Sequence, residues 1–181
     1  MPASLPSNPE PGAVGDVEPA PKSLLIDISG IDLGATYADR DAIAKANPHR
    51  GVMAMLDRVV WMSPDMTEGV AYKKIRHDEF WVPGHFPGKA VFPGVLMVET
   101  AAQLSCYMYV VRKTGPGLVF FLRIEDAAFR SAVVPGDDFY VLCKEVRAQR
   151  RRFISDVQGI VGDRVAFDAR ISGMFAEGRT V

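Results

Sequence analysis

The sequence predicts an α+β fold in which an antiparallel sheet of about six strands wraps around one long central helix. Residues 94–113 form a long apolar segment with no proline or glycine after Gly94. Two segments typical of strands come before it, and four come after it, separated by turn residues. A single antiparallel sheet around one helix would bury all of these apolar faces together.

The chain begins with a segment that lacks any apolar period. Residues 1–22 contain six prolines among alanine, glycine and serine, so we expect a disordered N-terminal tail. Residues 23–181 are then expected to form a single domain. The apolar cluster at 24–28 is expected to add an edge strand. Residues 36–46 are expected to form a short helix that ends at Asn47-Pro48, since a residue before proline resists helical angles.

Two strands are predicted next, at residues 52–62 and 67–77, joined by the turn Ser63-Pro64-Asp65. The prolines and glycines of residues 78–92 predict an irregular loop. Pro93 suits the first turn of a helix, where its missing amide hydrogen is not needed.

The long helix is predicted over residues 94–113, which at ~1.5 Å per residue would span about 30 Å. It contains Glu99 and Gln103. A charged side chain near the middle of a lipid-spanning helix costs roughly 2.5–3.5 kcal/mol. We therefore interpret the segment as the buried helix of a globular core and expect no association with a membrane.

The remaining chain has the alternation of strands. In the last segment, for example, Val165, Phe167 and Ala169 alternate with polar or small residues. Pro135-Gly136-Asp137 and Val161-Gly162-Asp163 are typical of hairpin turns. The predicted strands are 118–131, 138–149, 152–161 and 164–175.

Charge and cysteine content narrow the function classes. The formal net charge is −1, so no nucleic-acid partner is expected. Cys106 and Cys143 lie far apart and form no C-x-x-C pair, which disfavours a disulfide framework or a thiolate zinc site and favours a cytoplasmic location.

Two ionisable residues flank the start of the long helix. His85 lies in a loop stiffened by Pro83 and Pro87, and a histidine near neutral pH can accept a proton. Glu99 lies about a turn and a half into the helix, where apolar surroundings favour a protonated carboxyl that can act as a general acid. Gln103, at i+4 from Glu99, can hold that carboxyl by a hydrogen bond.

The start of the helix supplies a third element. The first amide hydrogens of a helix have no partners within the helix and lie at the positive end of its dipole. Because Pro93 has no amide hydrogen, the amides of Gly94 and Val95 are the natural donors to a carbonyl oxygen. A thioester carbonyl bound there would be polarised, and its α-hydrogen would become more acidic.

These motifs resemble a known family. The sequence is similar, from Asn47 to Phe175, to the β-hydroxyacyl-(acyl carrier protein) dehydratases of type II fatty acid synthesis, in the branch with glutamate on the helix. The spacing of 14 residues between His85 and Glu99 matches that family. The motifs that carry the resemblance are Gly84-His85-Phe86-Pro87-Gly88, Pro93-Gly94-Val95-Leu96, and Glu99 followed by Ala102-Gln103.

The resemblance implies the hot-dog fold and a dehydratase reaction. His85 would abstract the α-proton of a (3R)-3-hydroxyacyl thioester, Glu99 would protonate the departing hydroxyl, and Gly94 would bind the thioester carbonyl. Phe86, Val95 and Gln103 would complete the substrate site. The acyl chain would be carried on the phosphopantetheine arm of acyl carrier protein, with no other cofactor and no metal. The family's active site lies across a homodimer interface, and a trimer of dimers remains an open alternative.

Other interpretations remain open. The same fold could hydrolyse thioesters, or could bind acyl carrier protein without catalysis. A basic run around residues 144–152 is either a solvated strand end or a docking surface for the acidic carrier. His49 is expected to be a structural hydrogen-bonding residue. Residues 104–107 depart from the family pattern and are candidates to line the acyl tunnel.

Overall fold

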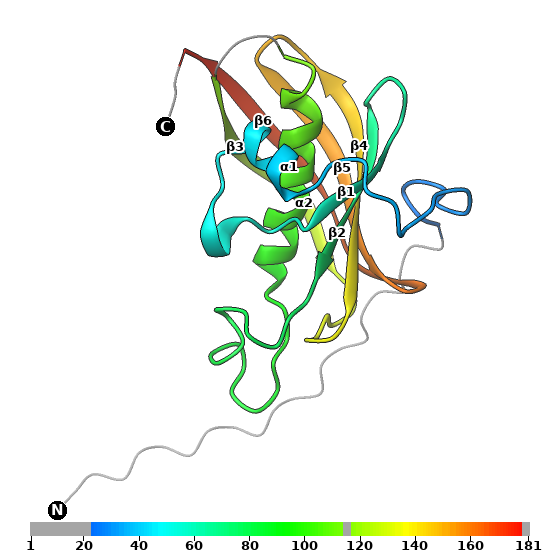
Figure 1. Ribbon diagram of the computed structural model, residues 1–181, viewed down its shortest axis with the longest axis vertical. Helices are drawn as coiled ribbons and strands as arrows, with labels where there is room; N and C mark the ends of the chain where they lie inside the picture. The colour runs from blue at the N-terminus through cyan, green and yellow to red at the C-terminus, as the bar shows by residue number, and fades with distance from the viewer. Residues whose placement is uncertain (1–22, 114–116, 179–181) are drawn as a thin grey trace, which may run out of the picture.

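The computed structural model describes residues 23–113 and 117–178. A six-stranded antiparallel sheet, in the order β1-β2-β4-β5-β6-β3, curves around the long helix α2 (Figure 1). The predicted hot-dog fold is thereby confirmed. The strands are β1 Arg58–Met62, β2 Glu68–Lys74, β3 Gly117–Phe129, β4 Asp138–Ala148, β5 Arg152–Val161 and β6 Arg164–Glu177.

The predicted tail 1–22 lies outside the described residues, and the single-domain extent of 23–181 stays a prediction. The edge strand predicted at 24–28 is wrong. The backbone amide of Leu25 donates instead to the side-chain oxygen of Gln158 (3.0 Å), and Ile26 is buried. The segment therefore lies against the outer face of the sheet without joining a ladder.

The first helix, α1 (Arg40–Ala46), starts later than predicted because Asp39 caps it. The Asp39 carboxylate accepts a hydrogen bond from the amide of Ala42 (2.8 Å). The helix ends at Asn47, before Pro48, as the sequence indicates. It lies over α2, on the side away from the sheet (Figure 1).

The first strand pair is shorter than the predicted 52–62 and 67–77. Residues Gly51–Met53 form a 3₁₀ turn, and β1 begins only at Arg58. The sequence around 52–56 is apolar because Met55 and Leu56 are buried in the core. Burial, and not strand pairing, explains the apolar character of this segment.

The central helix α2 spans Gly94–Val110, three residues short of the predicted end. Arg112 folds back, and its Nε donates to the carbonyl of Met108 (3.0 Å), which satisfies a carbonyl that a longer helix would use. Residues from Met97 to Tyr109 are mostly buried, in agreement with the prediction that protein surrounds the helix. No helix of the described residues is long and apolar enough to cross a membrane.

The core lies between α2 and the concave face of the sheet. Phe139, Phe167, Ile171 and Leu104 belong to it and are almost fully buried. The strand β3 differs from the others, because most of its side chains are exposed and it pairs only with β6 along one side. One long edge of the sheet is therefore left open in the single chain.

Candidate active site

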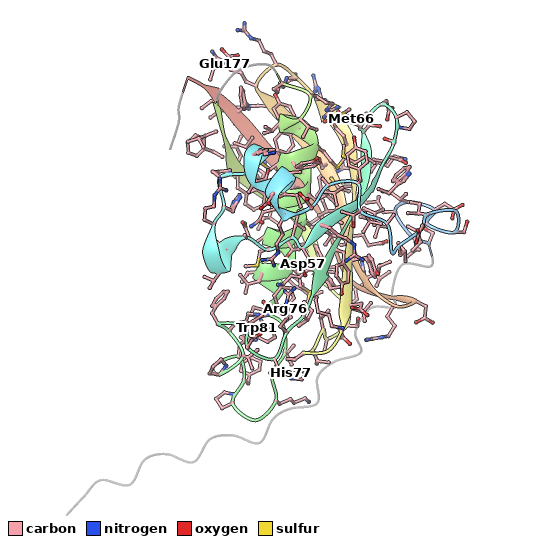
Figure 2. All side chains as sticks on the ribbon, in the orientation of Figure 1. Asp57, Met66, Arg76, His77, Trp81 and Glu177 are labelled. Atoms are coloured by element: carbon pink, nitrogen blue, oxygen red, sulfur yellow. The ribbon has the colours of Figure 1, made fainter. Side chains whose placement is uncertain are left out.

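The segment between β2 and α2 carries His85 and is fixed to the sheet by Glu79. The Glu79 carboxylate accepts hydrogen bonds from Lys73 Nζ (2.8 Å), the amide of Arg76 (3.2 Å) and Trp81 Nε1 (3.0 Å). Arg76 in turn donates to Asp57 Oδ1 (2.8 Å). Figure 2 shows Arg76 and Trp81 toward the end of the molecule that carries this loop, with Asp57 nearer the middle.

Aromatic packing holds the other end of the loop. The ring centroids of Trp81 and Phe92 lie 5.4 Å apart, and those of Phe92 and Phe139 lie 5.9 Å apart. The amide of Phe92 donates to the carbonyl of Val133 (2.7 Å). An irregular loop rich in proline and glycine is thus given a fixed position, which a reactive side chain needs.

The ring of His85 is oriented by the backbone. Its Nδ1 lies 2.7 Å from the carbonyl oxygen of Val91, and the ring stacks on Phe86 with centroids 4.1 Å apart. A carbonyl oxygen can only accept a hydrogen bond, so Nδ1 must carry the proton. Nε2 then has a free lone pair and can act as a base.

His85 faces the first turn of α2 across a cavity of about 480 Å³. Gly94, Val95 and Phe129 also line this cavity. Among the described residues, no hydrogen bond uses the backbone amides of Gly94 and Val95. A carbonyl oxygen in the cavity would therefore find unpaired amide donors at the positive end of the helix.

Gly94 also leaves room for an aromatic ring. A Cβ at position 94 would lie 2.7 Å from Cε1 of Phe129, closer than real Cβ contacts. The absence of a side chain at 94 lets Phe129 of β3 cover the start of the helix. The lack of a side chain at Gly94 therefore helps to shape the cavity.

Glu99 lies further along α2 and is held by Gln103. Gln103 Nε2 donates to Glu99 Oε1 (2.8 Å), as the i+4 spacing predicts. The Glu99 side chain is 24% exposed in the single chain, less enclosed than the sequence led us to expect. His49 Nε2 lies 3.3 Å from the same carboxyl oxygen.

The single chain does not bring His85 and Glu99 into one cavity. Glu99 lines a separate pocket of about 80 Å³, together with Gln103, Cys106 and residues of β3, β5 and β6. Val95 and Phe86 are exposed, the former at the mouth of the His85 cavity. The predicted base and acid therefore line two separate cavities of the single chain.

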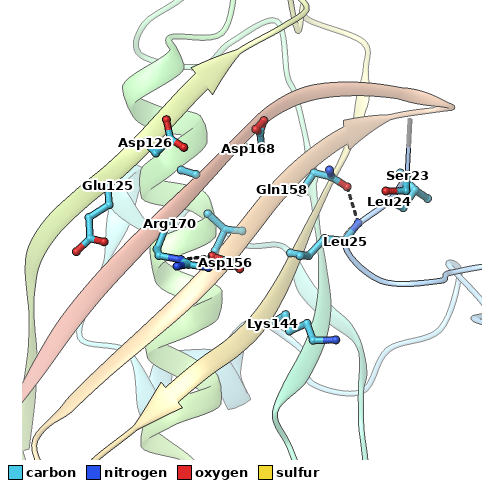
Figure 3. Close-up of a pocket in the computed structure, with 12 residues that line it drawn as sticks. Ser23, Leu24, Leu25, Glu125, Asp126, Lys144, Asp156, Gln158, Asp168 and Arg170 are labelled. Atoms are coloured by element: carbon cyan, nitrogen blue, oxygen red, sulfur yellow. Dashed lines mark hydrogen bonds and ion pairs between the residues drawn. The ribbon is translucent and has the colours of Figure 1, made fainter. Parts of the chain in front are cut away.

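Another cavity, of about 680 Å³, lies on the outer face of the sheet (Figure 3). Its lining is polar and includes Arg170, whose Nε donates to Oδ1 of the neighbouring Asp156 (2.6 Å). None of the predicted site residues lines it. Within residues 23–113 and 117–178 there is also no cluster of three or more His, Cys, Asp or Glu side chains suited to a metal ion.

Some residues of the site region were not found from the sequence. Glu79 falls in the irregular loop predicted over residues 78–92, and that prediction does not indicate its hydrogen bonds. The carbonyl of Val91 is a backbone group, which no side-chain pattern indicates. The position of His49 beside Glu99 joins two distant parts of the chain. The sequence predicts a hydrogen-bonding role for His49 but does not indicate Glu99 as its partner.

Comparisons with known proteins agree with this architecture. The FabA-like domain family matches residues 47–170. The 3-hydroxyacyl-(acyl-carrier-protein) dehydratase FabZ of Desulfotalea psychrophila is 34% identical over 132 residues, which cover 71% of this chain and 87% of the relative. The FabZ of Sinorhizobium medicae is 36% identical over 141 residues, which cover 76% and 89%.

Solved structures support the fold. A dehydratase heterocomplex from Xenorhabdus doucetiae superposes with a TM-score of 0.66 at 16% identity, covering 78% of this chain and 93% of the other. A mutant thioesterase from Pseudomonas aeruginosa gives a TM-score of 0.58 at 12% identity, covering 78% and 96%. At such identities the likeness establishes the fold alone, which serves both dehydratases and thioesterases.

Proposed function

The chain belongs to the FabA-like domain family, whose relatives here are FabZ dehydratases, and from this premise we propose that it removes water from 3-hydroxyacyl thioesters carried on acyl carrier protein. The observation that carries the proposal is that His85, whose Nε2 is free to accept a proton, lines the same cavity as the unpaired amides at the start of α2. The product would be the trans-2-enoyl thioester.

The proposed reaction divides the work between three groups. The amides of Gly94 and Val95 bind the thioester carbonyl oxygen and stabilise the negative charge that develops there. His85 Nε2 takes the α-proton of a (3R)-3-hydroxyacyl chain, and the electrons of that C–H bond form the new double bond. The C3–O bond breaks, and Glu99 gives its proton to the departing oxygen, which leaves as water. A proton then passes from His85 to Glu99 through solvent and restores both groups.

The separation of His85 and Glu99 favours a homodimer with shared sites. The open edge of β3 exposes Phe120, Phe121, Leu122 and Ile124. Long apolar edges of this kind are seldom left uncovered in soluble proteins. We propose that two β3 strands meet about a two-fold axis and that Glu99 of each protomer completes the partner's His85 cavity.

The carrier protein needs a basic surface at which to dock. Arg147, Arg150, Arg151 and Arg152 are exposed around the turn between β4 and β5. Such a patch steers an acidic partner to the enzyme and weakens with salt. We propose that acyl carrier protein docks there, and that the reaction takes place in the cytoplasm, where the free thiols Cys106 and Cys143 stay reduced.

The test is turnover of 3-hydroxyacyl carrier protein, followed by formation of the enoyl product. His85→Ala and Glu99→Gln are each expected to lower kcat by about 10²- to 10⁴-fold, the usual contribution of an acid or base. His77→Ala and Asp163→Asn, both at exposed residues, are matched controls and should keep wild-type turnover. Thermal unfolding of all four variants should stay close to that of the wild type.

Two results would overturn the proposal. One is the absence of enoyl product from the wild type with every acyl chain length. The other is release of free thiol from the acyl carrier, detected with a thiol-reactive dye, which would show thioester hydrolysis instead. Full turnover by His85→Ala or Glu99→Gln would remove that residue from the mechanism.

A further inference from the structure

We infer that His49 is a positioning residue that, together with Gln103, holds one oxygen of Glu99 and thereby assigns the acidic proton to the other. The inference rests on the proposed function of Glu99 as general acid. It concerns a residue for which the sequence predicts only a structural role.

The orientation of Gln103 is fixed on every side. Its Nε2 donates to Glu99 Oε1 (2.8 Å) and to the carbonyl of Met53 (2.7 Å), while its Oε1 accepts from the amide of Met55 (3.0 Å). Only 2% of the residue is exposed. A flipped amide would place its oxygen against two acceptors, so Gln103 must present an N–H to Glu99 Oε1.

The segment that carries His49 is fixed as firmly. Asn47 Nδ2 donates to the backbone carbonyl of Gln103 (2.8 Å), which attaches the segment to α2. The guanidinium of Arg50 donates to the carbonyls of Asn47 (2.7 Å), His49 (2.8 Å) and Ala44 (2.8 Å). The backbone on both sides of His49 is therefore fixed, and this positions the His49 ring beside Glu99.

The ring of His49 presents Nε2 to the carboxyl. Nε2 lies 3.3 Å from Glu99 Oε1. Nδ1 is buried and has no hydrogen-bond partner among the described residues. If Nδ1 carried the proton, a buried N–H donor would have no acceptor. Burying an unprotonated nitrogen without a partner costs less free energy, so the proton belongs on Nε2. The contact is long, but hydrogen bonds around catalytic groups commonly tighten when substrate binds.

Two donors on Glu99 Oε1 have a consequence for catalysis. An oxygen that accepts from both Gln103 and His49 cannot also carry the acid's proton in that position, so the proton lies on Oε2. The carboxyl therefore offers its proton in one defined direction. Once the proton has left, both hydrogen bonds become charge-assisted and strengthen, which favours the step itself over the resting state.

The test compares two substitutions of His49 in the full-length enzyme. His49→Leu removes the donor, whereas His49→Gln keeps an N–H at about the same distance from the backbone as Nε2. We expect kcat to fall about 10- to 100-fold for His49→Leu, as for other losses of alignment, with KM little changed. We expect His49→Gln to recover most of kcat, and His49→Asn, whose amide is too short to reach, to behave like His49→Leu.

The inference fails if His49→Leu keeps wild-type kcat, or if His49→Gln is as impaired as His49→Leu while both remain folded. It can fail independently of the proposed function. An inactive Glu99→Gln beside a fully active His49→Leu contradicts only the role of His49. A fully active Glu99→Gln contradicts the proposed acid itself.

A second measurement covers the case in which His49→Leu does not fold. Nitrogen-15 NMR of the histidine rings reports which ring nitrogen carries the proton, and the chain has only three histidines to assign. The signals of position 49 are identified by their loss in His49→Gln. We expect a proton on Nε2 alone, and a proton on Nδ1 would contradict the inference.

Discussion

Both cysteine thiols are enclosed by the core, and this determines their chemistry. Burial raises the pKa of the Cys106 thiol to about 12, and burial likewise raises the pKa of the Cys143 thiol to about 12. Because the thiolate is the reactive form, we expect a thiol-reactive dye to label neither cysteine in the native enzyme near neutral pH. Both should react once guanidinium unfolds the chain. Rapid labelling of native protein that disappears in Cys106→Ser would show that the pocket beside Glu99 is open to solvent.

Single residues of the site could be predicted only where their contacts are local. The hydrogen bond between Gln103 and Glu99 follows from helix geometry and is confirmed. The unpaired amides of Gly94 and Val95 follow from the first turn of any helix. The partner of His85 Nδ1, the carbonyl of Val91, depends on the path of an irregular loop, and no side-chain pattern encodes that path.

At the scale of elements, the ion pair between Lys73 and Glu79 joins strand β2 to the loop that carries His85. The Lys73 side chain is only 4% exposed. Removing one partner of such a buried pair leaves an uncompensated charge, so Lys73→Met should lower the free energy of unfolding by about 3–5 kcal/mol. The exposed pair of Lys74 and Asp138 is a matched control. Lys74→Met should change the free energy of unfolding by only about 0–1 kcal/mol. Urea denaturation measures both, and equal losses would refute the special role of the buried pair.

The elements themselves were predicted well where alternation and turn residues agree. The strands β4, β5 and β6 lie within two residues of their predicted ends, because turn residues precede β4 and β6. The turn Val161-Gly162-Asp163 closes a hairpin between β5 and β6, as predicted. The hairpin predicted at Pro135-Gly136-Asp137 is wrong, because this turn joins β3 to β4 and these strands are not neighbours in the sheet. The errors lie where an apolar run is buried without pairing. Ile26 covers the outer face of the sheet, and Met55 and Leu56 fill the core. Apolar character alone cannot distinguish such buried segments from a strand.

At the scale of the whole molecule, we propose that the site is completed by a residue of the partner subunit. His85 and Glu99 line different cavities of one chain, and β3, whose open edge we propose as the dimer contact, supplies Phe129 to the first cavity and Val119 and Phe121 to the second. A two-fold axis beside β3 would therefore bring the His85 cavity of one protomer close to the Glu99 cavity of its partner. Under this arrangement a protomer inactivated at His85 still carries an intact Glu99 for its partner.

Mixing two inactive variants tests the shared site directly. When His85→Ala and Glu99→Gln subunits exchange at random, half of the dimers are mixed, and each mixed dimer has one site with both native groups, so about a quarter of wild-type activity should return. Adding Ile124→Lys, at an exposed apolar position of β3, to both variants should abolish this recovery and give monomers in analytical ultracentrifugation. The same change at Tyr37, an exposed residue beside β1 at the opposite edge of the sheet, should leave the recovery intact. If subunits exchange but no activity returns, each site is built from a single chain. A conformational change within one protomer must then bring His85 and Glu99 together.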